Sequence, residues 1–121
     1  MKILVVDDYN TMRRIMKNLL SQLGHTDVDE AIDGGTALQK MQLHKYDLVI
    51  SDWNMEPMSG LQLLKEVRAD KHMCNIPFIM VTAESKTDNV IAAKAAGVNN
   101  YIVKPFNAET LKAKITAVMG V

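Results

Sequence analysis

Three carboxylates, one hydroxyl and one ammonium group stand at the ends of apolar runs in the sequence. They are Asp7 and Asp8 after the run 2–6, Asp52 after 46–51, Thr82 at the end of 76–82, and Lys104 at the end of 100–104. Clustered carboxylates raise one another's pKa, and a hard divalent cation such as Mg²⁺ relieves this with oxygen ligands. With a lysine beside them, such groups could receive a phosphoryl group, with Asp52 as the nucleophile.

The elements that would position these groups follow from the alternation of apolar runs with segments of helical periodicity. The expected strands cover 2–6, 28–31, 46–51, 76–82 and 100–104, and the expected helices cover 12–23, 34–44, 61–67, 87–97 and 111–118. Gly24 would end the first helix and Asn107 would cap the last. Alternating strands and helices predict a parallel sheet covered on both faces, an α/β doubly wound (βα)₅ domain over 1–121. Such folds bind ligands at the carboxyl ends of their strands.

Composition limits the classes of function. The 121 residues carry 14 basic and 14 acidic side chains, so no net charge favours nucleic acid or anionic lipid. Cys74 is the single cysteine and cannot form an internal disulfide. The apolar run at the N-terminus is too short for a signal peptide or a membrane span. These features favour a cytoplasmic protein that binds neither nucleic acid nor membrane.

Four motifs resemble the receiver domain of bacterial two-component response regulators. They are VVDD (5–8), SDWNM (51–55), MVTAE (80–84) and YIVKPF (101–106), in family order along essentially the whole chain. The segments TMRR (11–14), DWNM (52–55), VTAE (81–84), IAA (91–93) and VKPF (103–106) resemble the stand-alone chemotaxis branch. The resemblance implies a flavodoxin-like sheet with strand order 2-1-3-4-5, and a single receiver domain without an output domain.

The resemblance also assigns roles to the strand-end residues. Asp52 would be the phosphoacceptor, assisted by Lys104 and Thr82. The Mg²⁺ ligands would be Asp7, Asp8, Asp52 and the backbone carbonyl of Asn54.

Two further sets of residues concern switching and the lifetime of the phosphoryl group. Thr82 and Tyr101 match the switch pair of the family, and the bond from Lys104 to Pro105 would be cis. Asn54 and Glu84 stand two residues beyond Asp52 and Thr82, beside the path of the attacking water. We therefore expect Asn54 and Glu84 to tune dephosphorylation.

The implied function is that of a monomeric signalling protein, an enzyme only for its own phosphorylation and dephosphorylation. A sensor histidine kinase would donate the phosphoryl group from a phosphohistidine. A surface over about 84–115 would then bind the flagellar motor switch, and a phosphatase is a further partner to consider. The sequence leaves open a phosphate sink that never contacts the motor, or a pathway unrelated to motility.

One departure from the family pattern and three rival classes remain. Glu56 fills the position where the family commonly has Met-Pro, and Pro57 follows it; Glu56 either faces solvent or reaches the metal or the kinase. A phosphatase of the haloacid dehalogenase type would carry an acid where Asn54 stands. A dinucleotide-binding domain would have a glycine-rich turn in place of DDYN (7–10). A pseudo-receiver without phosphorylation would lack one of the site residues, and none is missing.

Overall fold

Five parallel strands alternate with five helices along the part of the chain that the computed structural model describes, residues 1–83 and 87–120. The strands are β1 (Ile3–Val6), β2 (Val28–Ala31), β3 (Leu48–Asp52), β4 (Phe78–Thr82) and β5 (Asn100–Val103). The helices are α1 (Asn10–Gln22), α2 (Gly34–Leu43), α3 (Gly60–Ala69), α4 (Thr87–Ala95) and α5 (Ala108–Met119). The strand order is β2-β1-β3-β4-β5, which confirms the predicted doubly wound fold.

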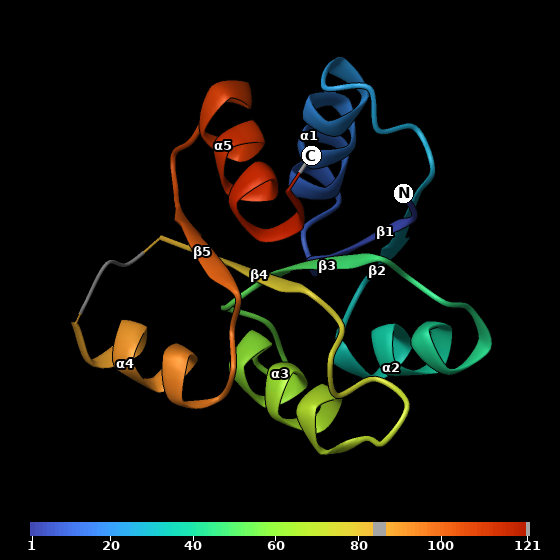
Figure 1. The fold of residues 1–121 in the computed structure, drawn as a ribbon, viewed down its shortest axis with the longest axis vertical. Helices are drawn as coiled ribbons and strands as arrows, with labels where there is room; N and C mark the ends of the chain where they lie inside the picture. The colour runs from blue at the N-terminus through green and yellow to red at the C-terminus, as the bar shows by residue number, and fades with distance from the viewer. Residues whose placement is uncertain (84–86, 121) are drawn as a thin grey trace.

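The sheet separates two hydrophobic cores, because successive side chains of a strand point to opposite faces. Ile3 and Val5 of β1 pack with side chains of α1 and α5, whereas Leu4 and Val6 pack with those of α2 and α3. In Figure 1, α1 and α5 lie above the sheet and α2, α3 and α4 lie below it. Burial on both faces explains why β1, β3 and β4 read as largely continuous apolar runs, whereas the edge strands β2 and β5 contain polar residues.

Local signals in the sequence set the ends of several helices. Asn107 caps α5 as predicted, since its side chain accepts a hydrogen bond from the Thr110 N–H at 2.9 Å. Asp33 and Ser59 cap α2 and α3 in the same way. Gly24 follows the end of α1 with a φ of 90°, a left-handed conformation that favours glycine.

The predicted bounds of two strands are wrong at their amino ends. β3 begins at Leu48 rather than at residue 46, and the buried Tyr46 ahead of it donates a hydrogen bond to Asp29 Oδ2 at 2.7 Å. β4 begins at Phe78 rather than at residue 76. At the other end of β3, Asp52 is the last residue of the strand itself.

Arg68 joins three segments beneath the sheet. Its guanidinium donates hydrogen bonds to Cys74 O and Ile76 O in the α3–β4 loop, at 3.2 and 2.7 Å. It also donates to Gly97 O and Asn99 Oδ1 ahead of β5, at 3.0 and 2.9 Å. All four acceptors are neutral oxygens, so Arg68 acts as a hydrogen-bond donor rather than as a partner in an ion pair.

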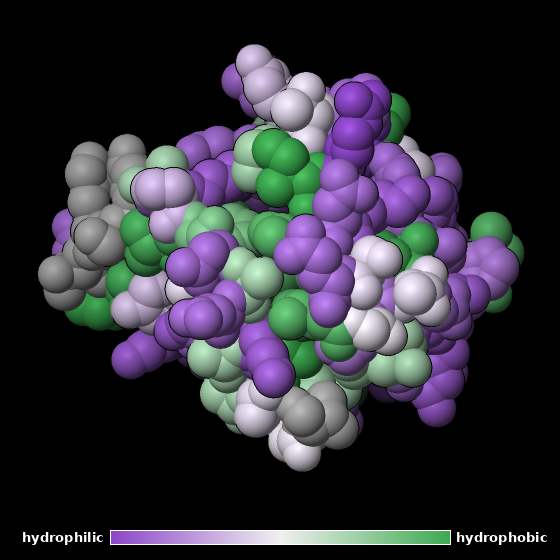
Figure 2. All heavy atoms as spheres, turned by 90° about the horizontal axis from the view of Figure 1, so that it is seen from above, coloured by the Kyte–Doolittle hydropathy of each residue, from purple (hydrophilic) through white to green (hydrophobic). Residues whose placement is uncertain are grey.

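The outer surface mixes polar and apolar side chains. Figure 2, which looks down on the side of α1 and α5, shows small groups of hydrophobic residues between hydrophilic ones. Among the helices that the structure describes, none has the length and apolar character needed to cross a membrane.

Candidate functional site

Backbone hydrogen bonds hold the predicted site residues at the carboxyl edge of the sheet. Asp7 N–H donates to Ala31 O of β2 at 3.1 Å, Trp53 N–H to Val81 O of β4 at 2.8 Å, and Lys104 N–H to Thr82 O at 2.8 Å. Each bond continues the pairing of its strand by one residue. The row of bonds fixes the spacing of the side chains that leave this edge.

The carboxylates of Asp7, Asp8 and Asp52 form a cluster at this edge. One oxygen from each lies within 4.8 Å of the others. Asp7 is 7% exposed and Asp52 6% exposed, whereas Asp8 lies at the surface. Burial raises the pKa of Asp7 to about 6, and the charges of Asp52 and Asp8 add to the effect. Burial also raises the pKa of Asp52, against the lowering effect of Lys104. Both buried acids therefore favour a positive charge nearby.

Lys104 supplies part of that charge. Its Nζ lies 3.0 Å from Asp52 Oδ1, and only 25% of the lysine side chain is exposed. This ion pair is the contact that Asp52 Oδ1 makes, since the buried oxygen has no hydrogen-bond partner among the described residues. A buried carboxylate oxygen in this condition is costly unless another group satisfies it.

The cluster fits a hard divalent cation. All donor atoms are oxygens, two of the three carboxylates are buried with raised pKa values, and Asp52 Oδ1 lacks a hydrogen bond. Mg²⁺ accepts few protein oxygens and keeps several waters, which suits an edge where Asp8 stays exposed. A cation bound here would lower the cost of ionising Asp7 and Asp52 together.

Thr82 and Tyr101 share a small cavity with Trp53, the residue that follows Asp52. Thr82, the buried last residue of β4, lines the cavity together with Trp53, Tyr101 and residues of α4. Tyr101 is half-buried on β5, and Lys114 Nζ lies 5.4 Å from the centre of its ring. Trp53 packs partly against the core beneath the sheet. The cavity thus lies between the loop after β3, the strands β4 and β5, and the helix α4.

The loop after β3 returns to Asp52 at Gly60, whose N–H donates to Trp53 O at 2.8 Å. Asn54 and Glu56 are exposed in this loop, and Glu56 is not among the three clustered acids. The Lys104–Pro105 peptide bond is cis, and so is the Glu56–Pro57 bond, which the sequence did not lead us to expect. Glu84, expected to affect dephosphorylation, lies outside the described residues.

Arg13 is the residue of this region that the sequence reasoning missed. Its side chain is buried against β1 and β2, and its Nη1 donates to the backbone carbonyl of Asp7 at 2.8 Å. Arg13 lies on the same buried stripe of α1 as Met16 and Leu20. A charged residue at an apolar-stripe position was the available signal, because such a residue is buried only when its charge is paired.

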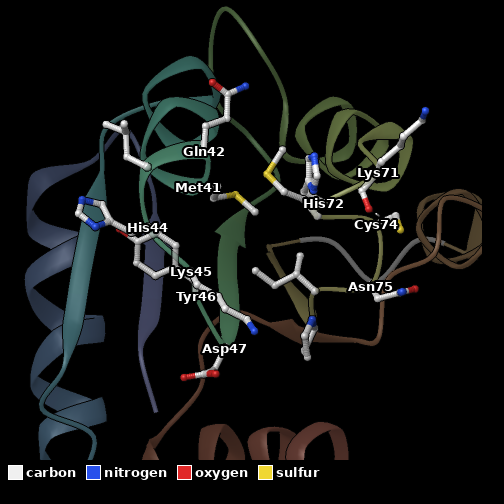
Figure 3. Close-up of a pocket in the computed structure, with 14 residues that line it drawn as sticks. Met41, Gln42, His44, Lys45, Tyr46, Asp47, Lys71, His72, Cys74 and Asn75 are labelled. Carbon is white, nitrogen blue, oxygen red and sulfur yellow. Dashed lines mark hydrogen bonds between the residues drawn. The ribbon is translucent and has the colours of Figure 1, made fainter.

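A larger cavity of about 550 Å³ lies at the opposite edge of the sheet, between the α2–β3 and α3–β4 loops. Met41 and Tyr46 line it from one side and Met73 and Ile76 from the other. In Figure 3 the side chain of Met41 points inward, while Lys71 points away from the centre. No member of the carboxylate cluster lines it, so the cavity and the cluster are separate features of the fold.

Comparison with known proteins agrees with the geometry. The family model described as the response regulator receiver domain matches residues 3–116. The chain is 55% identical over 115 residues to the chemotaxis protein CheY of Pseudomonas aeruginosa. The aligned region covers 95% of this chain and 93% of the relative. It is 54% identical over 115 residues to the chemotaxis protein CheY-3 of Vibrio cholerae, covering 95% and 88%.

Solved structures are similar over nearly the whole chain. Chemotaxis protein CheY4 of Vibrio cholerae superposes with a TM-score of 0.91 at 36% identity, covering 98% of both chains. The receiver domain of a sensor histidine kinase from Pseudomonas aeruginosa superposes with a TM-score of 0.89 at 26% identity, covering 99% of this chain and 98% of that one. With its doubly wound sheet, its carboxylate cluster and these relatives, the chain belongs to the response regulator receiver domain family.

Proposed function

We propose that this protein is a two-component response regulator that accepts a phosphoryl group on Asp52. The observation that carries the proposal is the position of the Asp52 carboxylate, buried at the end of β3 beside two acids and 3.0 Å from Lys104. The donor is a phosphohistidine on a sensor histidine kinase. An Asp52 oxygen attacks phosphorus, the phosphorus–nitrogen bond breaks, and the histidine nitrogen keeps the electron pair. The protein catalyses only this transfer and its own dephosphorylation.

Asp7, Asp8, Asp52 and the backbone carbonyl of Asn54 hold Mg²⁺ in this proposal. The fit of the carboxylate cluster supports it, and the receiver structure from Pseudomonas aeruginosa is described with a magnesium ion coordinated in its active site cleft. The ion supplies charge neutralisation on the transferring oxygens. Lys104 adds a second positive charge there, and Thr82 donates a hydrogen bond to a phosphoryl oxygen once the group is in place.

Phosphorylation then changes the surface formed by α4, β5 and α5. Thr82 moves toward the phosphoryl group, and Tyr101 turns into the cavity that both residues line. The change is a shift between two populated packings rather than a new fold. Asn54, together with Glu84 beyond the described residues, controls how long the phosphoryl group lasts, because both flank the path of the attacking water.

The partners proposed are a chemotaxis sensor kinase, the flagellar motor switch protein and a phosphatase. Similarity to chemotaxis proteins of two bacteria supports this choice. The protein acts in the cytoplasm as a monomer. A phosphate sink that drains the same kinase, and a regulator of a pathway other than motility, are the alternatives. Binding to the motor switch protein with and without beryllofluoride separates them, since only a motor driver binds more tightly with the phosphoryl mimic.

Labelling with a small phosphodonor in Mg²⁺ tests the assignment of Asp52. The native chain should take up one phosphoryl group, and Asp52→Asn should take up none. Equal labelling of the two would sink the assignment. Trp53, next to the acceptor, provides a second measurement, since Mg²⁺ should change its fluorescence. A flat response up to tens of millimolar Mg²⁺ would contradict the metal site.

A further inference from the structure

Arg13 and Glu30 form an ion pair that is joined to the carboxylate cluster through the backbone of Asp7. Arg13 lies in the first turns of α1 and is 8% exposed, and Glu30 lies on β2. Arg13 Nε and Glu30 Oε1 are 2.8 Å apart, and Arg13 Nη2 donates to Asn10 Oδ1 at 3.2 Å. The remaining nitrogen, Nη1, donates to the backbone carbonyl of Asp7 at 2.8 Å. The planar guanidinium therefore joins α1, β2 and the end of β1 in one rigid arrangement.

Asp7 is restrained at three points as a result. Its N–H donates to Ala31 O of β2 at 3.1 Å, its carbonyl accepts from Arg13, and its Oδ1 accepts from the Tyr9 N–H at 2.9 Å. Glu30 precedes Ala31, so one end of β2 holds both the N–H of Asp7 and, through Arg13, its carbonyl. A buried carboxylate next to two others would otherwise relax away from them, because like charges repel.

Arg13, Lys17 and Glu30 form one group of paired charges beside the end of β1. Glu30 accepts from Arg13 and, through its other oxygen, from Lys17 Nζ at 2.8 Å. These bonds, that of Lys17 first, lower the pKa of Glu30, so it is ionised at neutral pH. Arg13 thus fixes the backbone of Asp7 through a hydrogen bond to its carbonyl, and the guanidinium is itself oriented by its ion pair with Glu30.

We propose that Arg13 and Glu30 form a clamp that holds the Asp7–Asp8 turn in place for a divalent cation. Both are positioning residues, since neither belongs to the carboxylate cluster. The inference rests on the proposed function, because it assumes that the cluster binds Mg²⁺. A site built before the ion arrives binds it more tightly, since the ion does not have to order its own ligands.

A role through charge and a role through position predict opposite changes in Mg²⁺ affinity for one substitution, so that substitution distinguishes the two. If Arg13 acted through its charge, Arg13→Gln would remove a positive neighbour and tighten Mg²⁺ binding. The clamp predicts weaker binding, by about tenfold, the lower end of the effect known for residues that support metal ligands. Glu30→Gln should weaken binding to a similar extent, because the guanidinium loses the carboxylate that orients it.

Mg²⁺ is titrated at fixed pH and salt while Trp53 fluorescence is followed, with the rise in unfolding temperature on adding Mg²⁺ as a second readout. Circular dichroism establishes that each variant is folded. Arg14→Gln is the matched control, since Arg14 is exposed on the same helix and the substitution removes the same charge. The affinity of Arg14→Gln for Mg²⁺ should stay the same or rise slightly. Arg13→Lys keeps the charge without the planar fork and should lie between the native chain and Arg13→Gln.

Weaker binding in Arg13→Gln and Glu30→Gln, with Arg14→Gln unchanged, supports the clamp. Native or tighter binding in folded Arg13→Gln overturns it, and so does equal weakening in Arg14→Gln. Should Arg13→Gln not fold, Arg13→Lys decides, because weaker binding in a variant that keeps the charge comes from the lost planar fork, and native binding there overturns the clamp. A native chain without any Mg²⁺ response would refute the metal site itself, and the clamp with it. If the native chain responds to Mg²⁺ and the variants bind Mg²⁺ equally well, the clamp alone is refuted.

Discussion

Gly60 lies so close to the backbone of Asp52 that a single added methyl group should disturb the acceptor. A Cβ built at Gly60 would lie 2.2 Å from the carbonyl oxygen of Asp52 and 2.7 Å from Met80 Sδ. Met80 is flexible and can move aside, but the Asp52 carbonyl belongs to the central strand β3 and cannot. In Gly60→Ala either the start of α3 or the end of β3 must therefore shift.

The expected cost follows from two opposing effects. Replacing glycine by alanine in a helix is favourable by up to about 1 kcal/mol, whereas overpacking a well-packed site costs about 1 to 3 kcal/mol. The clash with a fixed backbone atom should dominate, so we expect Gly60→Ala to lose about 2 kcal/mol of unfolding free energy. For a domain of this size that loss corresponds to a fall in Tm of roughly 8 °C.

Gly35→Ala is the control, because Gly35 also lies in the first turn of a helix and is exposed. A Cβ there would have Asp33 Oδ1 at 3.7 Å as its nearest neighbour, an ordinary contact. Urea unfolding should show Gly35→Ala as stable as the native chain or slightly more stable. Labelling by a small phosphodonor should be slower in Gly60→Ala alone, since only that substitution moves the Asp52 peptide. Equal stability and equal labelling of the two variants would refute the reasoning.

Three other substitutions test charge and hydrogen bonding elsewhere in the fold. With a chelator present at pH 7.5, the free energy of unfolding of Asp7→Asn should exceed that of the native chain by about 1 to 3 kcal/mol, at about 1.4 kcal/mol per pKa unit. The reason is that the folded-state pKa of Asp7, about 6, exceeds the unfolded value of 3.8, so native stability falls as the pH rises between the two. The stability gain of Asp7→Asn should vanish below pH 3.8. A gain that persists there would contradict this explanation. The pKa of Glu30 is lowered instead, by its bonds with Lys17 and Arg13, so its contribution is complete above the unfolded value of 4.5 and is lost as the pH falls through the folded value. Acid titration of the unfolding free energy should therefore show Glu30→Gln destabilised at pH 7 and converging with the native chain in acid; a constant difference would argue against this. Arg68→Met removes a donor to four oxygens, so the free energy of unfolding in urea should fall by about 2 kcal/mol. The control Lys71→Met should change it little. A loss under about 0.5 kcal/mol in Arg68→Met would show that water replaces those bonds.

The sequence predicted the elements and the meeting of the strand-end residues because both depend on local pattern. Apolar runs alternating with helical periodicity imply a parallel sheet, and such a sheet brings Asp7, Asp52 and Lys104 to one edge wherever the loops run. The cap at Asn107 was likewise readable from residue type and position.

Contacts between distant segments were not predictable in this way. Arg13 reaches the carbonyl of Asp7 only because α1 packs across β1 and β2, and Gly60 meets Asp52 only because the loop after β3 folds back on it. The Tyr46 hydroxyl, just ahead of β3, bonds to Asp29, a partner 17 residues away. Each of these contacts depends on how the elements and loops pack, which residue type and local periodicity do not reveal.

The row of backbone hydrogen bonds at the carboxyl edge has a consequence for insertions and deletions. Neighbouring strands lie about 4.8 Å apart, and each residue advances about 3.3 Å along a strand and points to the opposite face. Deleting one residue within β1 or β3 would move Asp7 or Asp52 along the strand and turn it toward the wrong core. Added residues in the loops at the amino edge would leave that spacing intact. Length changes in related chains should therefore collect in those loops and avoid the strands.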